Sequence, residues 1–214
     1  MFTVTLLGDK HSGKTSLANA LSTHRVDSDS KVHIYEGKAG VRIHDPQEKC
    51  NLVQKLARSS LNMVTCSRDT TNFNTTKEHL ALARTSNSRV PTALVVTKND
   101  LKPMHLGVSQ LGKKYGVDFT NTAWADHDFE KKILQIMTER FGADRLFYTS
   151  STQGAGIRDL ENWILDIKSM DTEYADFGGN NSREHLLLRV KHTKKKYRET
   201  GGCAEMSCDS CQIQ

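Results

Sequence analysis

Near the start of the chain stands the run that decides the fold, Gly8-Asp9-Lys10-His11-Ser12-Gly13-Lys14-Thr15. It matches the pattern G-x-x-x-x-G-K-[ST], a loop whose backbone N–H groups surround phosphates at the N-terminus of a helix. The apolar-rich run 2–7 before it predicts a buried strand, and residues 16–21 after it predict a helix. A strand, a glycine-containing loop and a helix in this order predict a phosphate-binding site that extends from Gly8 to Ser16.

Two side chains of this loop carry the expected chemistry. Lys14 is expected to reach the outer phosphates of a nucleotide, and the Thr15 hydroxyl to ligate Mg²⁺. We assign both to catalysis, because phosphoryl transfer depends on positioning and charge stabilisation. Lys10 also lies in the loop, where it either adds positive charge, obstructs an arginine supplied by a partner, or is a solvated lysine.

A second motif, Thr97-Lys98-Asn99-Asp100, follows the β-rich run 90–96, in which Pro91 opens the predicted strand. In an open α/β sheet, ligand contacts come from the carboxyl ends of the strands. By itself such a tetrapeptide is usually a surface turn. After a phosphate loop, it resembles the guanine-reading motif of the Ras superfamily of small GTPases, whose Rho-type members carry this threonine form.

That resemblance implies roles for this motif and for one further segment of the chain. Asp100 would accept hydrogen bonds from the guanine ring N–H and exocyclic amine, and the Lys98 stem would pack over the base. The loop Thr149-Ser150-Ser151-Thr152 resembles the one whose backbone N–H reads the guanine carbonyl oxygen. The implied ligands are GTP or GDP with Mg²⁺, with Thr97 and Ser150 to Thr152 also lining the site.

The periodicity of the chain predicts the fold class. Strand patterns occupy 2–7, 31–35, 41–45, 61–66, 90–96 and 145–149, and helical patterns lie between or after them. We therefore predict a doubly wound, mostly parallel six-stranded α/β sheet with helices on both faces. Residues 23–30 are polar and are predicted to be irregular. The predicted domain covers 1–169 and resembles the small-GTPase fold, with a long insertion at 101–128 where Rho-type members carry a helical one.

The segment after the third predicted strand departs from the family pattern Asp-x-x-Gly-Gln. Asp45 is still expected to hold Mg²⁺ through a water, but Glu48 stands in place of the glycine and Lys49 in place of the glutamine. A carboxylate near the γ-phosphate faces like charge, and Pro46 removes a backbone donor. The departures predict slow hydrolysis.

The family's first switch threonine has no clear counterpart. Thr23, Ser28 and Ser30 are the candidates, in a segment that is short for the family. Three histidines nearby have no metal-ligand spacing, and we expect them to lie on the surface or on a sheet face. They are His24, His33 and His44.

Charge and composition limit the functions and locations that remain possible for the chain. Of the 214 residues, the stretch from Arg183 to Glu199 carries seven basic side chains against two acidic ones, which accounts for the whole net charge of +5. Because the excess lies in a tail and not on a folded face, nucleic-acid binding is not expected. No apolar run is long enough to span a membrane and no signal-peptide pattern is present, so we expect a cytosolic location, and a monomer.

The predicted tail, 170–214, ends in Cys211-Gln212-Ile213-Gln214, which fits the prenylation pattern C-a-a-X with a final residue typical of farnesylation. One lipid chain holds a protein only marginally, so a second signal is required. The basic run and palmitoylation at Cys203 and Cys208 would supply it. Residues 171–181 are predicted to be a flexible linker.

Three functional hypotheses follow. The first is a GTP/GDP switch anchored to the cytoplasmic face of a membrane, acting on effector and regulatory proteins through its switch segments. The second is a non-hydrolysing binding module that holds nucleotide as a structural ligand. The third, an ATP-dependent kinase, requires the motif at 97–100 to be accidental.

Overall fold

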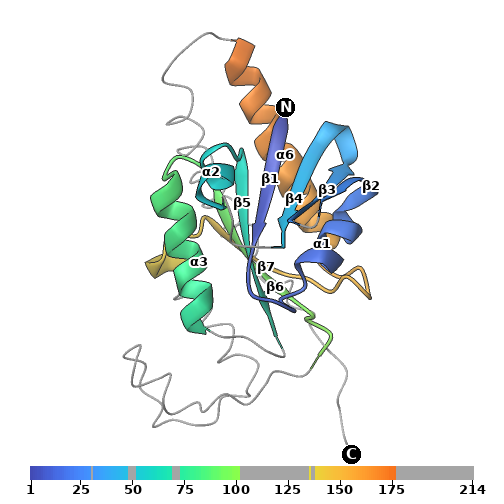
Figure 1. Cartoon of the computed structure of the whole chain (residues 1–214), viewed down its shortest axis with the longest axis vertical. Coiled ribbons are helices and arrows are strands. Elements are labelled where there is room, and N and C mark those ends of the chain that lie inside the picture. Colours follow the sequence, from blue (N-terminus) through green and yellow to red (C-terminus); the bar gives the residue numbers. More distant parts are fainter. Residues whose placement is uncertain (30, 48–51, 69–72, 102–134, 136–137, 177–214) are drawn as a thin grey trace, which may run out of the picture.

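The computed structural model describes residues 1–29, 31–47, 52–68, 73–101, 135 and 138–176. Within them, seven strands form one sheet in the order β2-β3-β4-β1-β5-β6-β7 (Figure 1). The strands are β1 (Phe2–Leu7), β2 (Ser22–Asp29), β3 (Val32–Gly37), β4 (Val41–Pro46), β5 (Leu61–Ser67), β6 (Thr92–Thr97) and β7 (Arg145–Tyr148). Strands β4, β1, β5, β6 and β7 are parallel, whereas β2-β3 and β3-β4 pair antiparallel.

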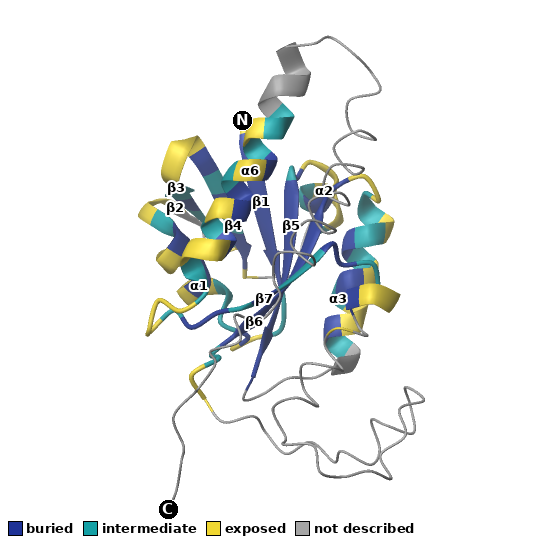
Figure 2. Ribbon diagram, turned by 180° about the vertical axis from the view of Figure 1, so that it is seen from behind, coloured by how far each residue is buried: buried dark blue, intermediate teal, exposed yellow. Residues whose placement is uncertain are grey.

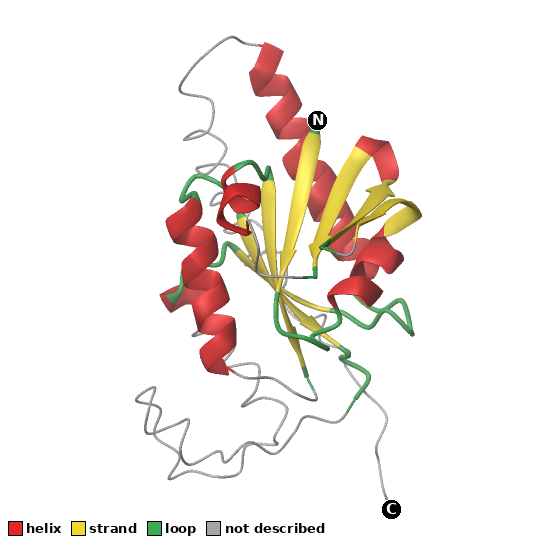
Figure 3. Cartoon of the chain, viewed as in Figure 1, coloured by secondary structure: helices red, strands yellow, loops and turns green. Residues whose placement is uncertain are grey.

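Helices cover both faces of the sheet, as the doubly wound pattern predicts (Figure 3). They are α1 (Lys14–Leu21), α2 (Leu52–Ala57), α3 (Phe73–Ser86) and α6 (Ile157–Asp176), with a short 3₁₀ helix η1 (Lys38–Gly40) between β3 and β4. Helices α1 and α6 pack on one face, and α2 and α3 on the other. This arrangement is the expected α/β architecture.

Alternation along β1 explains how one strand serves two cores. Phe2, Val4 and Leu6 contribute to the core beneath α1 and α6, whereas Leu7 belongs to the core beneath α2 and α3. Successive side chains of a strand point to opposite faces, so Thr3 and Thr5 share the second face with Leu7, where both are buried. Figure 2 shows these central strands as the most buried part of the molecule.

The prediction that residues 23–30 are irregular is wrong, because most of them form strand β2. The sheet consequently has seven strands, whereas six were predicted. Strand β2 lies at the edge and pairs only with β3, with register shifts near His24 and near Arg25. Its side chains from Thr23 to Asp27 are exposed. Since they cover no core, they need no apolar alternation, and the pattern gave no sign of a strand.

The prediction of a flexible linker at 171–181 is wrong for residues 171–176, because helix α6 continues to Asp176. Its buried stripe of Leu160, Trp163, Ile164 and Ile167 packs on the sheet, with the Trp163 ring 5.3 Å from that of Phe147. The helix thus runs past residue 169, where we placed the domain boundary. Residues 177–214 lie outside the described part, and with them Cys203, Cys208 and Cys211, the cysteines predicted to carry lipids.

Nearly all of the predicted insertion at 101–128 also lies outside the described residues. Cys66, in β5, is a buried thiol. Among the helices that the structure describes, none combines the length and apolar character needed to cross a membrane.

One buried polar side chain gives the first testable prediction. Asn62 is fully buried on the face of β5 that carries Val64, and neither its Oδ1 nor its Nδ2 has a hydrogen-bond partner in the structure. We expect Asn62→Leu to stabilise the protein by about 1–3 kcal/mol, because an unpaired buried amide loses its hydration without compensation. Urea denaturation would show a higher midpoint at an unchanged slope.

The opposite-direction control is Asn62→Asp, which buries a charge at the same place and should lower the midpoint. A lower midpoint for Asn62→Leu as well would mean that the amide holds an ordered water in solution, and the prediction would be wrong.

Candidate nucleotide-binding site

The phosphate-loop residues line a cavity of about 770 Å³ at the carboxyl end of β1. It is bounded by Leu6, Leu7, Gly8, Asp9, Lys10, His11, Gly13, Lys14, Thr15, Ser16, Pro46, Gln47, Leu52, His79 and Lys98. The cavity therefore joins the loop to the end of β4, to Lys98 after β6, and to helices α2 and α3. Sequence reasoning gave Leu52 and His79 no part in a site, since each lies in a helical pattern without a motif.

Close packing fixes the shape of the loop. A Cβ at Gly8, whose φ is +147°, would lie 2.3 Å from Thr65 Oγ1, so only glycine fits. The hydroxyls of Ser12 and Thr65 are 2.7 Å apart, and Thr97 Oγ1 donates to the Ser12 carbonyl at 2.7 Å. Thr97 was expected to line a guanine pocket. In the structure its hydroxyl hydrogen-bonds the backbone of the phosphate loop. Thr65 was missed because nothing marks it within its strand.

Lys14 folds back over the loop that precedes it. Its Nζ donates to the carbonyls of Gly8 and Asp9, both at 2.8 Å. Burial lowers the pKa of this ammonium from its ordinary value, and the charges of Asp45 and Asp9 oppose the shift. A further anion beside the ammonium would favour its charged form, which makes this a suitable place for phosphate.

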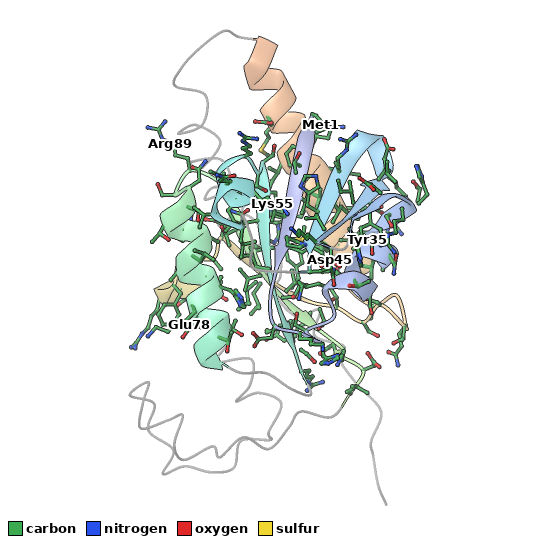
Figure 4. The ribbon with its side chains drawn as sticks, in the orientation of Figure 1. Met1, Tyr35, Asp45, Lys55, Glu78 and Arg89 are labelled. Atoms are coloured by element: carbon green, nitrogen blue, oxygen red, sulfur yellow. The ribbon has the colours of Figure 1, made fainter. Side chains whose placement is uncertain are left out.

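Asp45 lies at the end of β4 beside α1 (Figure 4). It is fully buried, and its Oδ2 accepts a hydrogen bond of 2.6 Å from the Thr15 hydroxyl. Its Oδ1 is buried without a partner in the structure. A carboxylate and a hydroxyl side by side form the oxygen donor set that Mg²⁺ prefers, and the unpaired Oδ1 leaves capacity for a metal-bound water. The residues present therefore fit the expected magnesium ion.

The two proposed guanine-reading segments lie together. Thr152 Oγ1 donates to Asp100 Oδ2 at 3.4 Å, and the Ser150 and Thr152 hydroxyls are 3.0 Å apart. Hydrogen bonds from Ser150, from the Asp100 backbone and from Thr152 lower the pKa of the Asp100 carboxyl. Asp100 is exposed and stands outside the lining of the cavity, whereas Ser151 is half-buried between these partners.

Arg68 is a positioning residue that the sequence did not reveal. It is buried just after β5, and its Nη1 donates to the Asn99 carbonyl at 2.9 Å. Its backbone N–H donates to the Thr97 carbonyl at 3.1 Å, and the Asn99 N–H to the Thr149 carbonyl at 3.0 Å. These bonds fix the loop that carries Lys98 and Asp100. A lone arginine has no sequence signature for such a role.

Of the candidates for the first switch, Thr23 is not brought to the cavity. Thr23 lies in β2 and its hydroxyl donates to the Glu36 carbonyl at 2.9 Å, so it serves strand pairing. Ser28 belongs to the same edge strand, and Ser30 lies outside the described residues. Glu48 and Lys49, on which slow hydrolysis was predicted, also lie outside them. Pro46 and Gln47 do line the cavity.

The three histidines differ in their surroundings. His24 is exposed, with its Nε2 3.5 Å from a carboxylate oxygen of Glu36. His44 is half-buried, and burial, with smaller effects of Lys55 and Arg42, lowers the pKa of its imidazole. His33 directs its Nδ1 toward Asp45, at 4.0 Å from Oδ2. Sequence reasoning gave His33 no role, because its neighbour Asp45 is brought beside it only by strand pairing.

Comparison with known proteins identifies the fold. No protein-family model and no curated protein matches the chain. A solved structure that does match is translation elongation factor SelB from Methanococcus maripaludis in its apo form, with a TM-score of 0.51 and 16% identity over 78% of this chain. The fold is that of a P-loop GTPase. The match covers 33% of the SelB chain.

The P-loop GTPase fold is thus shared, while the narrower resemblance to the Ras superfamily rests on the motifs in the sequence. The comparison also agrees with the mostly parallel α/β sheet.

A pair of glycines after the 149–152 loop gives a second prediction. Gly154 and Gly156 have φ values of +71° and +69°, but a Cβ at Gly154 would meet nothing within 4 Å, whereas one at Gly156 would lie 2.0 Å from the Tyr148 carbonyl oxygen. We expect Gly154→Ala to cost about 1–2 kcal/mol from backbone strain alone. Gly156→Ala should cost about 3 kcal/mol or more, since a backbone clash is added to that strain.

Thermal unfolding of the two variants side by side measures the difference, and Gly154→Ala is the matched control for the backbone angle. Equal losses would mean that β7 and the start of α6 can separate without cost.

Proposed function

We propose that this chain binds GTP and GDP with Mg²⁺ and hydrolyses GTP slowly, as a molecular switch. The observation that carries the proposal is the joint placement of two motif sets at one edge of the sheet. Lys14 and the hydrogen-bonded Thr15–Asp45 pair would take the phosphates, and Asp100 with its partner Thr152 would take the base. Similarity to a solved structure with the P-loop GTPase fold supports it.

Each residue has a part that follows from its position. Lys14 would exchange its two carbonyl partners for phosphate oxygens, which carry full negative charge. Thr15 and Asp45 would hold the magnesium ion, which supplies positive charge to the phosphates. Asp100 would accept from the two donors of guanine, for which adenine has no equivalent pair.

Hydrolysis would proceed by in-line attack of water on the γ-phosphate, driven by positioning and electrostatic stabilisation. The expected rate is low, because the sequence has Glu48 and Lys49 where the Ras-like pattern has the glycine and the water-orienting glutamine. A carboxylate near the γ-phosphate opposes its charge.

The alternative is a binding module that retains nucleotide without hydrolysis. One structural observation favours it. Strand β2 takes up residues 22–29 in the sheet, and the hydroxyl of Thr23 is bonded to the Glu36 carbonyl, so Thr23 does not supply a hydroxyl to the cation. The switch hydroxyl would then have to come from Ser28, from Ser30 or from elsewhere in the chain.

The location and partners of the protein belong to the same proposal. Farnesylation of Cys211, palmitoylation of Cys203 and Cys208 and the basic run before them would hold a monomer at the cytoplasmic face of a membrane. Effector and regulatory proteins would bind the switch segments. Partition of the full chain onto vesicles, with Cys211→Ser as the control, tests this part separately.

The deciding experiment identifies the nucleotide extracted from freshly purified protein by chromatography. Mostly GDP supports a hydrolysing switch, and mostly GTP supports the binding module. In a competition assay against fluorescent GDP, ATP should fail to displace the probe. Displacement by ATP as effective as by GTP would overturn guanine recognition and favour an ATP-dependent enzyme.

A further inference from the structure

His33 and Asp45 form a cross-strand pair at the cation position. They stand directly opposite each other in the antiparallel register of β3 and β4. Residues opposite in such a pair project from the same face, here the face covered by α1. Asp45 reaches Thr15 at the start of α1, which places the imidazole of His33 beside the two residues that fit a divalent cation.

Both members of the pair have an unused ligand atom. Asp45 is fully buried and its Oδ1 has no hydrogen-bond partner in the structure. His33 Nδ1 is also buried and unpartnered, although 22% of the side-chain surface is exposed. The 4.0 Å between His33 Nδ1 and Asp45 Oδ2 is too long for a hydrogen bond. Unpaired buried polar atoms are rare in native proteins and call for an explanation.

Packing orients the imidazole. The ring of Tyr35, two residues along β3, meets the His33 ring edge to face at a centroid distance of 6.5 Å (Figure 4 labels Tyr35). Tyr35 is itself buried in the core, and the Arg25 guanidinium lies 5.9 Å from its ring centroid. The neighbouring strand and the core thus limit the positions open to the His33 ring.

We propose that His33 Nδ1 is a nitrogen ligand of the cation that accompanies the nucleotide, and that the site consequently prefers Mn²⁺ over Mg²⁺ more strongly than an all-oxygen site would. Imidazole nitrogen suits first-row transition ions, whereas Mg²⁺ prefers oxygen.

The proposal rests on nucleotide binding for the remaining ligands. Among the described residues, no group of three or more His, Cys, Asp or Glu side chains is able to hold a metal ion. Phosphate oxygens would therefore have to complete the coordination by His33 and Thr15, with Asp45 holding the ion through a metal-bound water.

The test uses Mn²⁺ as the probe on the full chain loaded with GDP. Electron spin echo spectra should show a nitrogen coupling that changes when the histidines carry ¹⁵N, and His33→Ala should abolish it. Titration followed by electron paramagnetic resonance should show roughly 10- to 100-fold weaker Mn²⁺ binding in that variant. Competition with Mg²⁺ should show a much smaller loss for Mg²⁺.

His24→Ala is the matched control, because His24 lies on the adjacent strand with its ring next to Glu36 and away from the cation. It should leave the nitrogen coupling intact. His33→Gln keeps a polar side chain of similar reach and serves as a second variant if alanine disturbs the sheet. Wild-type spectra without nitrogen coupling would overturn the proposal, as would equal losses for Mn²⁺ and Mg²⁺ in both His33 variants.

Failure of nucleotide binding is measured separately, with fluorescent GDP in the presence of a chelator and then of Mg²⁺. If GDP does not bind under either condition, the proposed function fails. Mn²⁺ is then titrated onto the protein alone, where a nitrogen coupling lost in His33→Ala would uphold the ligand assignment and no coupling would overturn it.

Discussion

Lys14→Ala should weaken the binding of GDP and GTP by roughly 30- to 3,000-fold, which corresponds to about 2–5 kcal/mol for removing one member of a hydrogen-bonded charge pair. The ammonium already lies over the loop, held by the carbonyls of Gly8 and Asp9. Without this ammonium, the negative charge of the phosphates would lack the main positive side chain that the protein offers it. Equilibrium titration with fluorescent GDP measures the change.

Lys10→Ala is the matched control, since Lys10 also lines the cavity but is exposed. If its charge only contributes to the general field, the loss of affinity should be small, because solvent screens an exposed charge. A Lys14→Ala variant that binds GDP like the wild type would contradict the phosphate-loop assignment. Equal losses for the two variants would mean that net charge and not position determines binding.

Asp100→Asn should exchange guanine specificity for xanthine specificity. A carboxylate offers two acceptors to the ring N–H and exocyclic amine of guanine, whereas an amide offers one acceptor and one donor. Xanthine carries a carbonyl in place of that amine, so it matches the amide. We expect GDP affinity to fall and xanthosine diphosphate affinity to rise, with a combined change on the order of 1,000-fold or more. Competition between the two nucleotides measures it directly.

Thr152→Ala provides the control, because it removes the 3.4 Å hydrogen bond to Asp100 and leaves the carboxylate in place. It should keep the preference for guanine. If Asp100→Asn leaves the ratio between the two nucleotides unchanged, the segment 97–100 is a surface turn, and base recognition must come from other residues.

The sequence alone predicted those strands and helices whose apolar residues recur with a regular spacing and are buried in the core. Strand β1 carries Phe2, Val4 and Leu6 on one face, and β5 and β6 are rich in apolar and β-branched residues, so their local pattern predicts strands. The glycine pattern placed the phosphate loop at the end of β1. The stripe from Leu160 to Ile167 marked α6, although its end did not show, since no helix-ending residue follows the stripe directly.

The edge strand and the contacts of the site depended on tertiary structure. Strand β2 is polar and exposed, and only its hydrogen bonds to β3 make it a strand. Thr97 supports Ser12 although the two are 85 positions apart, and His33 meets Asp45 through strand register. Such pairs leave no trace in local periodicity, because each residue type alone is common in strands and loops. Pattern and propensity act over a few neighbouring residues, whereas the geometry of this site is set by parallel strands that bring distant segments to one edge.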